Sequence, residues 1–276
     1  MSIFDGASTL LRFPSGRLKT LAWHTQAYVT LTGRALAGLF TRPFYMRDLV
    51  VQLDSIGVGS LGIVFLTGLF TGMVLALQSA IEMEQFGATI YIGRLVGAST
   101  VRELGPVLTA LMVSGRAGSG IAAELGAMRV TEQIDALQTM GVDPVRKLVV
   151  PRFAACLLAL PMLTLVTDIV AILGGMLIAV VKLGLTPDLY MRSVYQTLAQ
   201  SGFVFRYIPI DFVMGFTKPL IFGAIIALTA CHFGLRTTGG TEGVGRAATG
   251  SVVVASILIL AADYFVTQIL IALLLP

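Results

Sequence analysis

The chain has 276 residues, of which 56% are hydrophobic and only 12% are charged, and its mean hydropathy is +0.88. This composition excludes an ordinary soluble globular domain and indicates an integral membrane protein. The net charge of +4 does not indicate a nucleic-acid-binding protein, because the basic residues are dispersed around apolar segments and form no stripe.

The N-terminal residues combine basic and apolar side chains. Between about 15 and 44, leucine, valine and aromatic residues alternate with Arg, Lys, His24 and Thr, a composition that suits a helix lying in the membrane interface. Trp23 and Tyr28 would then lie at headgroup depth. A poorly ordered cytoplasmic tail is the alternative for this region, which we extend over 1–52. No apolar core of the signal-peptide kind precedes it, so we expect the first hydrophobic span to remain as an anchor.

Five apolar segments follow, and each is long enough to cross a bilayer. A spanning helix needs roughly 20 mostly apolar residues, because every backbone amide in the hydrocarbon must be bonded within the helix. The predicted spans are about 55–81, 92–122, 153–181, 208–233 and 247–275. The sequence therefore predicts an all-α integral membrane protein with a single domain over 1–276, whose transmembrane region of five helices covers 53–276.

The distribution of basic residues predicts the orientation of these spans. Thirteen Lys and Arg residues lie on one side of the predicted membrane and five on the other. Because cytoplasmic loops carry the excess of Lys and Arg, we expect the N-terminus and the second-to-third connection in the cytoplasm. An odd number of spans then leaves Pro276 on the outer, periplasmic side.

The second-to-third connection contains a charged, helix-patterned insert at about 121–141. Its apolar positions recur at helical spacing and are Ala127, Val130, Ile134 and Leu137. Gly141 and Pro144 end the pattern. We interpret the insert as a cytoplasmic coupling helix that docks into a soluble partner, and a solvated surface helix is the alternative. Its candidate coupling residues are Glu124, Arg129, Glu132, Gln133, Asp135 and Leu137.

The glycine patterns indicate helix packing. Gly57-Val-Gly59-Ser-Leu-Gly62 has the spelling of a dinucleotide fingerprint, but it opens a charge-free membrane span and follows no predicted strand. We interpret this pattern as a helix-packing surface. Gly68 and Gly72 continue the surface as a small-xxx-small motif, which lets a neighbouring backbone approach closely.

No motif in the chain predicts catalysis or a bound cofactor. A Gly-Lys-Ser/Thr phosphate loop is absent, so nucleotide energy must come from another subunit. His24 and His232 have no companion carboxylates at metal-ligand spacing, so we predict no metal site. A Gly-x-Ser-x-Gly elbow with a plausible triad is also absent.

Ionisable residues inside the spans are the strongest candidates for function, because each costs about 2.5 to 3.5 kcal/mol at the bilayer centre and must face protein or a wet cavity. Arg102 and Glu103, followed by Gly105-Pro106, predict the polar mouth of an otherwise aliphatic cavity that suits a lipid. The alternative is a pair that anchors the outer interface. Gln78 is a weaker candidate for the same mouth. The other intramembrane charges favour contacts between helices, with a proton or substrate relay as the alternative: Asp168, Asp211, Lys218 and Asp263.

Motifs in the middle of the chain form a contiguous block. They are Arg102-Glu-Leu-Gly-Pro-Val-Leu-Thr-Ala-Leu111, Gly115-Arg-Ala-Gly-Ser119, Ala123-Glu-Leu-Gly-Ala-Met-Arg-Val-Thr-Glu-Gln-Ile-Asp135 and Met140-Gly-Val-Asp-Pro144, extended by Val149-Val-Pro-Arg152 and Gly243-Val-Gly-Arg246. This block and the five-span layout resemble the MlaE/YrbE permeases of lipid-transporting ABC systems, whereas the stretch from 1 to about 44 carries little of the resemblance.

The resemblance implies a homodimer of permease chains in the bacterial inner membrane. Each chain would bind a cytoplasmic ATPase through the helix near 124–137, and ATP and Mg would be held by that ATPase. A periplasmic hexamer of MCE-domain subunits and a small STAS-domain protein are the other implied partners, and nucleic acid is not one. The lipid cavity would be bordered by Leu75, Gln78, Arg102, Glu103 and Leu104.

The function expected from this resemblance is that of a transport subunit and not of an enzyme. It would move phospholipid between the inner and outer membranes and so maintain outer-membrane lipid asymmetry. A proton-coupled secondary carrier for a hydrophobic substrate is the alternative. Such a carrier would titrate Asp168, Asp211 and Asp263 and would often have two related halves, but we find no internal repeat. A membrane enzyme acting on lipids is less consistent with the sequence, because no nucleophile or metal cluster is visible.

Overall fold

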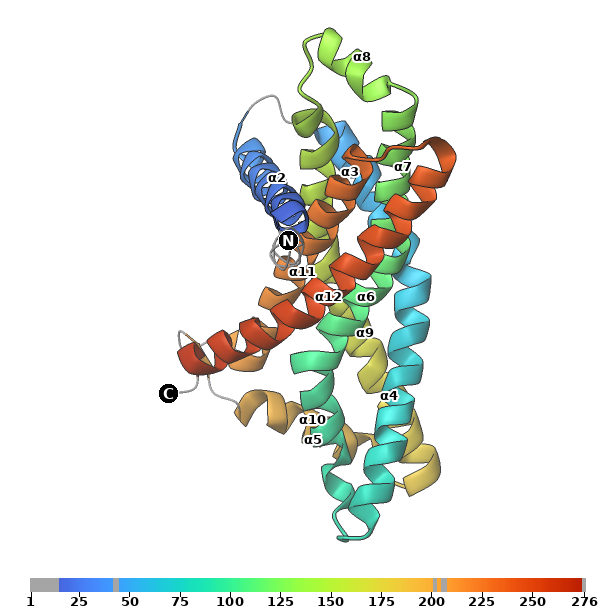
Figure 1. Ribbon diagram of the computed structural model, residues 1–276. Coiled ribbons are helices and arrows are strands. Elements are labelled where there is room, and N and C mark those ends of the chain that lie inside the picture. Colours follow the sequence, from blue (N-terminus) through green and yellow to red (C-terminus); the bar gives the residue numbers. More distant parts are fainter. Residues whose placement is uncertain (1–14, 42–44, 201–202, 205–207, 275–276) are drawn as a thin grey trace, which may run out of the picture.

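A computed structural model describes residues 15–41, 45–200, 203–204 and 208–274 of the chain (Figure 1). Apart from short turns, the described part is helical except for two-residue strands, β1 (Phe203–Val204) and β2 (Ile208–Pro209), which pair antiparallel. The predicted all-α class is therefore confirmed. Residues 1–14 of the predicted interfacial region and Pro276 lie outside the described residues.

The helices follow one another with short connections. The α-helices are α2 (Ser15–Leu39), α3 (Met46–Ile56), α4 (Leu61–Glu84), α5 (Ile92–Ser99), α6 (Gly105–Val113), α7 (Ser119–Val130), α8 (Gln133–Thr139), α9 (Val150–Leu183), α10 (Pro187–Gln200), α11 (Ile210–Leu235) and α12 (Gly240–Leu274). Short 3-10 turns are η1 (Val58–Ser60) and η2 (Thr89–Tyr91), and π-helical segments are η3 (Thr100–Leu104), η4 (Ser114–Gly118) and η5 (Val145–Val149). In Figure 1, α8 lies at one end of the molecule and α5 and α10 lie toward the other.

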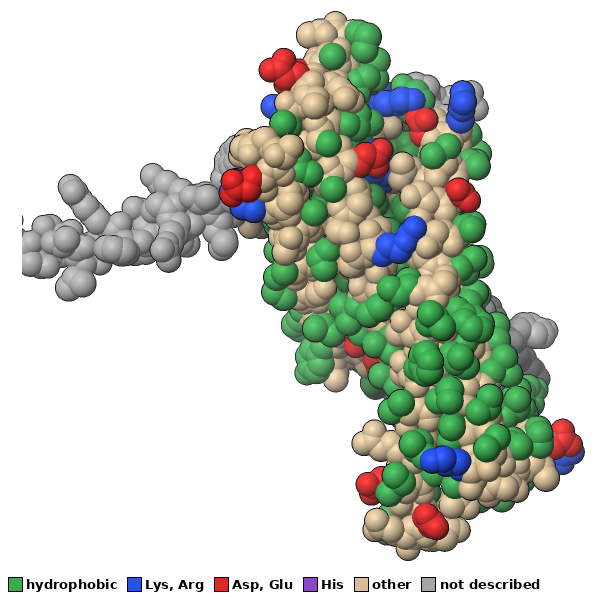
Figure 2. Space-filling model, turned by 90° about the vertical axis from the view of Figure 1, so that its right-hand side faces the viewer, with side chains coloured by type: hydrophobic (Ala, Val, Ile, Leu, Met, Phe, Trp, Pro, Cys, Tyr) green, Lys and Arg blue, Asp and Glu red, His purple; other side chains and the backbone are tan. Residues whose placement is uncertain are grey.

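Four helical stretches within the described residues are long and apolar enough to cross a membrane. They are Met46–Glu84, Val145–Leu183, Val213–Leu235 and Gly240–Leu273, and they correspond to the first, third, fourth and fifth predicted spans. Figure 2 shows the pattern expected of such a protein on one face: charged side chains lie mainly in the upper and lower parts, and apolar side chains lie between them. The chain is therefore a multi-pass membrane protein.

The second predicted span, 92–122, is not among these four stretches. Its residues do form a nearly unbroken helical path from Ile92 to Val130, but η3 and η4 interrupt the α-helix twice. These segments contain Arg102, Glu103 and Arg116, whose charges lower the hydropathy of the stretch. A five-span count therefore stays a prediction.

The π segments change which way the following side chains point. A π turn inserts extra backbone into the α-helical register and so rotates the residues after it relative to those before it. Because η3 contains Arg102 and Glu103, these charged side chains lie where the helical period of the sequence alone does not place them.

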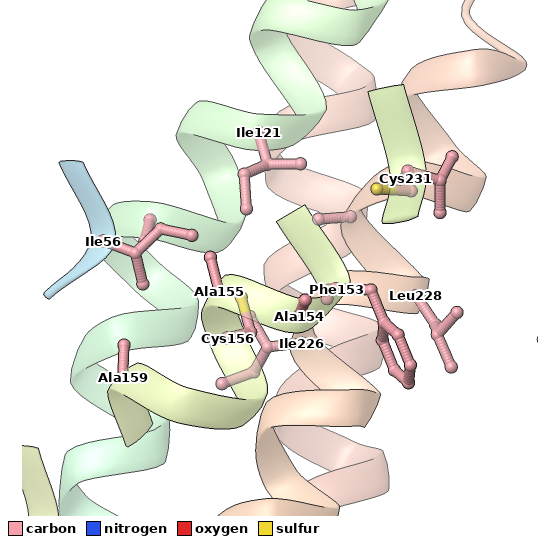
Figure 3. Packing of buried hydrophobic residues seen from close by; sticks show 14 of the residues in the cluster. Ile56, Ile121, Phe153, Ala154, Ala155, Cys156, Ala159, Ile226, Leu228 and Cys231 are labelled. Atoms are coloured by element: carbon pink, nitrogen blue, oxygen red, sulfur yellow. The ribbon is translucent and has the colours of Figure 1, made fainter. Parts of the chain in front are cut away.

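The core lies around α9, which packs against α4 on one side and α11 on another. Figure 3 shows Ile56 of α3, Ile121 of α7, Cys156 of α9 and Ile226 of α11 meeting in this core. All four are at most 4% exposed. The third predicted span is thus the central helix of the described bundle.

Glycines allow the close approach of α4 and α9. A Cβ atom at Gly72 would overlap the backbone of Ala171, and a Cβ at Gly174 would lie 2.5 Å from the carbonyl oxygen of Leu69. Gly68 lies against Thr167 in the same groove. The small-xxx-small pair of the first span therefore lies against another helix of the same chain.

The insert at 121–141 differs from the single continuous helix that the sequence predicts. It forms two helices, α7 and α8, which are separated at Thr131 and Glu132, and Glu132 has a left-handed backbone with φ of 59°. The break lets α8 turn so that Ile134 is buried and Leu137 packs against the core, whereas Val130 stays exposed. Burial of apolar area by α8 thus overrides the local helical period.

Candidate functional site

A cluster of ionised side chains joins η3, α11 and α12 inside the bundle. Arg102 donates two hydrogen bonds to Asp211 at the start of α11, from Nε to Oδ1 at 2.7 Å and from Nη2 to Oδ2 at 3.1 Å. This paired geometry is the strongest that an arginine and a carboxylate form. The side chain of Asp211 is only 2% exposed, whereas that of Arg102 is 40% exposed. Buried Asp211 therefore holds the guanidinium in position, while part of the Arg102 side chain stays exposed.

Lys218 lies at the centre of this cluster. Its side chain is 1% exposed, and its Nζ donates to the Glu103 carboxylate at 2.5 Å and to the Arg102 carbonyl oxygen at 2.8 Å. An ion pair to Asp263 Oδ1 of α12 at 3.0 Å completes its surroundings. A buried ammonium costs several kcal/mol unless it is paired and hydrogen-bonded, so these contacts hold three segments together.

A pocket of about 370 Å³ opens beside the cluster, between the α5–η3 junction, α11 and α12. One part of its wall is polar, and the hydroxyl of Thr267 donates to Glu103 there at 3.4 Å. The rest is mainly apolar. The lining residues are Ala98, Ser99, Arg102, Glu103, Ile210, Asp211, Met214, Thr267 and Ile271. Such a pocket accepts an apolar chain with an anionic or hydrogen-bonding end near Arg102.

Residues 49–269, which include the charged cluster and the residues that line the pocket up to Thr267, match the family described as Permease MlaE. This chain belongs to the MlaE permease family. The matched region contains the whole charged cluster and α4 to α11, so the family resemblance of the central motifs is confirmed.

Several relatives of this MlaE permease cover most of the chain. A probable ABC transporter permease protein of Rickettsia conorii is 43% identical over 235 residues, covering 85% of this chain and 87% of the relative. The intermembrane phospholipid transport system permease protein MlaE of Haemophilus influenzae is 38% identical over 222 residues, covering 80% and 82%. The chloroplastic protein TRIGALACTOSYLDIACYLGLYCEROL 1 of Arabidopsis thaliana is 35% identical over 246 residues, covering 89% and 68%.

The other predicted cavity residues of this MlaE permease lie away from the pocket. Leu75 is half-buried and packs against a cluster around Tyr190, and Gln78 is exposed on α4. Leu104 is half-buried in η3 beside Glu103 but does not line the pocket. The structure thus brings together Arg102 and Glu103 from the predicted set, and it adds residues that the sequence analysis treated separately.

Asp211, Lys218 and Asp263 are those added residues. The sequence predicts contacts between helices for these intramembrane charges, but it indicates no partner for Arg102. Opposite charges in different spans were the feature of the sequence that could have indicated this cluster, since isolated charges in apolar helices need partners. The pairing of Asp211 with Arg102 and of Lys218 with Glu103, across more than a hundred residues of chain, needed the tertiary structure.

Asp168 lies apart from this cluster, in the middle of α9. It is 7% exposed and faces α6 so closely that a Cβ at Gly105 would overlap its Oδ1. Within the described residues, that oxygen has no hydrogen-bond partner. Nearby, the hydroxyls of Thr109 and Thr167 are 2.6 Å apart.

The predicted coupling residues are divided between buried contacts and open surface. Glu124 pairs at 2.8 Å with Arg152 of α9, whose side chain is 5% exposed, so α7 is tied to the central helix. Arg129 pairs with Asp135 across the break between α7 and α8. Glu132 and Gln133 are exposed at the break itself and are accessible to another protein.

Proposed function

We propose that this MlaE permease is the membrane subunit of an ATP-driven transporter that moves phospholipid between the inner and outer membranes and maintains outer-membrane lipid asymmetry. The observation that carries the proposal is the pocket at Arg102, in which a guanidinium fixed by Asp211 faces a largely apolar space. The similarity to the Haemophilus influenzae permease of an intermembrane phospholipid transport system supports it.

The pocket matches the chemistry of a phospholipid. A phosphate accepts hydrogen bonds from an arginine fork, and the acyl chains need only apolar walls such as Met214 and Ile271. A phospholipid with two long chains is larger than this pocket, so a second copy of the permease would complete the cavity. Such a contact would use exposed apolar side chains of α12, among them Ile257, Leu260 and Phe265, which face lipid in a single copy.

The remaining parts of the transporter follow from the proposed orientation in the inner membrane. With the N-terminus in the cytoplasm and five spans, α7 and α8 face the cytoplasm and contact the ATPase, which binds ATP and Mg. The C-terminus faces the periplasm, where an MCE-domain hexamer receives or delivers lipid. A STAS-domain protein binds the ATPase in this arrangement.

Coupling between the ATPase and the lipid pocket runs along one helical path. α7 continues through η4 and α6 into η3, which contains Arg102 and Glu103. Movement of the α7–α8 junction, where Glu132 is exposed, is therefore transmitted along a stiff helix to the pocket. The Glu124–Arg152 pair carries the same movement to α9. The two π segments are the places where this path has non-α geometry and least regular hydrogen bonding.

Lipid that co-purifies with the protein tests the pocket. We expect Glu103→Ala to reduce the phospholipid retained by the purified full-length permease, because Lys218 loses one carboxylate and the polar rim is altered. Glu82→Ala, at an exposed position near the end of α4, is the matched control and should retain wild-type amounts. Undiminished phospholipid in Glu103→Ala, measured by mass spectrometry, would argue instead for a charge pair that only anchors the helices.

Charge reversal at the α7–α8 junction tests the coupling. Glu132→Lys and Arg129→Glu should abolish ATP-dependent phospholipid transfer by the reconstituted complex without preventing membrane insertion. Glu242→Lys, at an exposed position in the first turn of α12, is the control. Normal ATPase binding and transfer in the junction variants would contradict a coupling role for α7 and α8.

Asp168 supports a second candidate function, a proton-coupled carrier for a hydrophobic substrate. Asp211 and Asp263 are paired with Arg102 and Lys218, so Asp168 is the intramembrane carboxyl best placed to exchange a proton. Lipid movement in vesicles that hold the permease alone, driven by a proton gradient, would favour this carrier. Movement that requires the ATPase and ATP would exclude it.

A further inference from the structure

A second pocket lies at the opposite end of α11 from the charged cluster. It has a volume of about 380 Å³ and is formed by α2, α8, the segment 143–145 and the C-terminal end of α11. Asp211 and Leu235 are separated by nearly the whole of α11, about 36 Å at the rise of an α-helix. The two pockets therefore cannot hold the same headgroup.

Three arginines line this second pocket, which we call the arginine pocket: Arg34 of α2, Arg129 of α7 and Arg236 after α11. Asp143 is the acidic residue in its lining. Arg34 bonds Asp143 through Nη2 at 2.9 Å, and its side chain is 60% exposed, so it keeps other N–H donors for a further acceptor. Arg129 is paired in turn with Asp135, but a guanidinium has five N–H donors, so paired arginines still keep donors for an anion in the pocket.

The position of the arginine pocket is that of a lipid headgroup. The apolar stretch of α11 that is able to cross a membrane ends at Leu235, which lines the pocket. Leu31 of α2 and Ile134 of α8 add apolar side chains to the same lining and are themselves buried. The pocket therefore combines guanidinium groups with an apolar surface at the end of a membrane-spanning helix, and basic pockets between such helices bind anionic lipid headgroups.

We propose that the arginine pocket binds the phosphate of an anionic phospholipid of the surrounding membrane, at a site separate from the transported lipid. The inference rests on the proposed placement of α11 across the bilayer, but not on transport through the Arg102 pocket. A phosphate bound between Arg34 and Arg236 would bridge α2 and α11, and a glycerol backbone over Ile134 would hold α8 against them. The bound lipid would then fix the position of the α7–α8 junction.

Binding of fluorescent lipids to the purified full-length permease in neutral detergent tests this proposal. We compare phosphatidylglycerol with phosphatidylcholine carrying the same labelled acyl chains, and we expect the anionic lipid to bind more tightly. Arg34→Gln together with Arg236→Gln should lower the affinity for phosphatidylglycerol by about fivefold per arginine and leave phosphatidylcholine unchanged. Arg34→Lys with Arg236→Lys should retain most of the preference, which separates loss of charge from loss of folding.

Two control variants locate the headgroup preference. Arg47→Gln removes an exposed arginine of α3 that does not line the arginine pocket, and it should keep the wild-type preference. Arg102→Gln should also keep the preference, even if it loses transported lipid. A preference that disappears in Arg102→Gln but survives in the double glutamine variant would overturn the proposal, as would equal binding of the two lipids by the wild type.

A soluble phosphate has the same chemistry as the headgroup and is tested by competition. Glycerol phosphate and inorganic phosphate, added separately at millimolar concentration, should not displace labelled phosphatidylglycerol, because they lack the acyl chains that contact the apolar lining. Displacement by either would contradict a lipid ligand and assign the pocket to a free phosphate. The outcome does not depend on ATP or on transport, so it is independent of the test at Glu103.

Discussion

The ammonium of Lys218 lies 2.5 Å from the carboxylate of Glu103, and the two residues come from helices that are far apart in the sequence. Lys218 is 1% exposed, whereas Glu103 is 44% exposed and borders the pocket. The buried member therefore fixes the position of the accessible one.

Lys218→Met should destabilise the permease strongly. Three carboxylates, Glu103, Asp211 and Asp263, would then face Arg102 alone, and removal of one partner of a buried ion pair costs about 3–5 kcal/mol. Thermal unfolding in detergent measures the effect. Lys182→Met, at an exposed position near the end of α9, is the control and should unfold near the wild-type temperature. Equal unfolding temperatures for both variants would contradict a structural role of the Lys218 cluster.

Gly72→Ala should weaken the packing of α4 on α9. The added methyl group overlaps the backbone of Ala171, so the helices must separate, at a cost of about 1–3 kcal/mol. Gly62→Ala in the same helix is the matched control, because a Cβ at Gly62 meets nothing within 4 Å. This control should be neutral or slightly stabilising, since alanine favours helix more than glycine does. Equal destabilisation by the two substitutions would show that helix propensity, not close packing, decides the outcome.

Glu124→Gln should loosen α7 from α9. The guanidinium of Arg152 is buried and would lose its charged partner, which costs about 1–3 kcal/mol. We expect faster hydrogen exchange of the backbone amides of 119–130 in the variant. Glu242→Gln removes a carboxylate that is 82% exposed and is the control, with an expected effect within about 0.5 kcal/mol. Unchanged protection of α7 in Glu124→Gln would rule out this tie between the two helices.

Docking of α2 on α11 should weaken at high pH. Tyr28 bonds the hydroxyl of Thr229 at 3.2 Å and packs edge-on against His232. Burial raises the pKa of Tyr28 above its usual value of 10.0. The protonated phenol therefore contributes stability that is fully present below pH 10 and is lost as the pH rises through the raised pKa.

Thermal unfolding across this pH range measures the loss, and ultraviolet absorbance of the phenolate follows the titration. Tyr28→Phe should reduce the decrease in stability above pH 10 and should remove one late-titrating phenol from the absorbance curve. A Tyr28 that titrates with the exposed tyrosines would contradict the buried contact with α11.

The ion pairs of the candidate site could be predicted from the sequence only in part. Arg102 and Glu103 stand out in the sequence because charges in an apolar span need compensation. Their partners Asp211 and Lys218 are visible as charges too, but nothing in the spacing of residues says which carboxylate meets which cation. In the structure both residues lie in the π segment Thr100–Leu104, and their partners Asp211 and Lys218 lie on α11.

The insert between the second and third predicted spans shows a second limit. Its helical period predicted one helix, whereas the structure breaks it at Glu132 and buries Ile134. Local propensity is worth only a few tenths of a kcal/mol per residue, so the burial of a large apolar side chain in the hydrophobic core decides the conformation. That burial also forms one wall of the arginine pocket.

The sequence by itself determined that this protein is a helical membrane protein, where four of its spans run and to which family it belongs. Long apolar runs leave the backbone no alternative to helix inside a bilayer, and the motif block is read directly from the residues. The tertiary structure alone decided the ion-pair partners, the two pockets and the break between α7 and α8. These features depend on how helices are rotated and packed against one another, and that information is not contained in the period of any single helix.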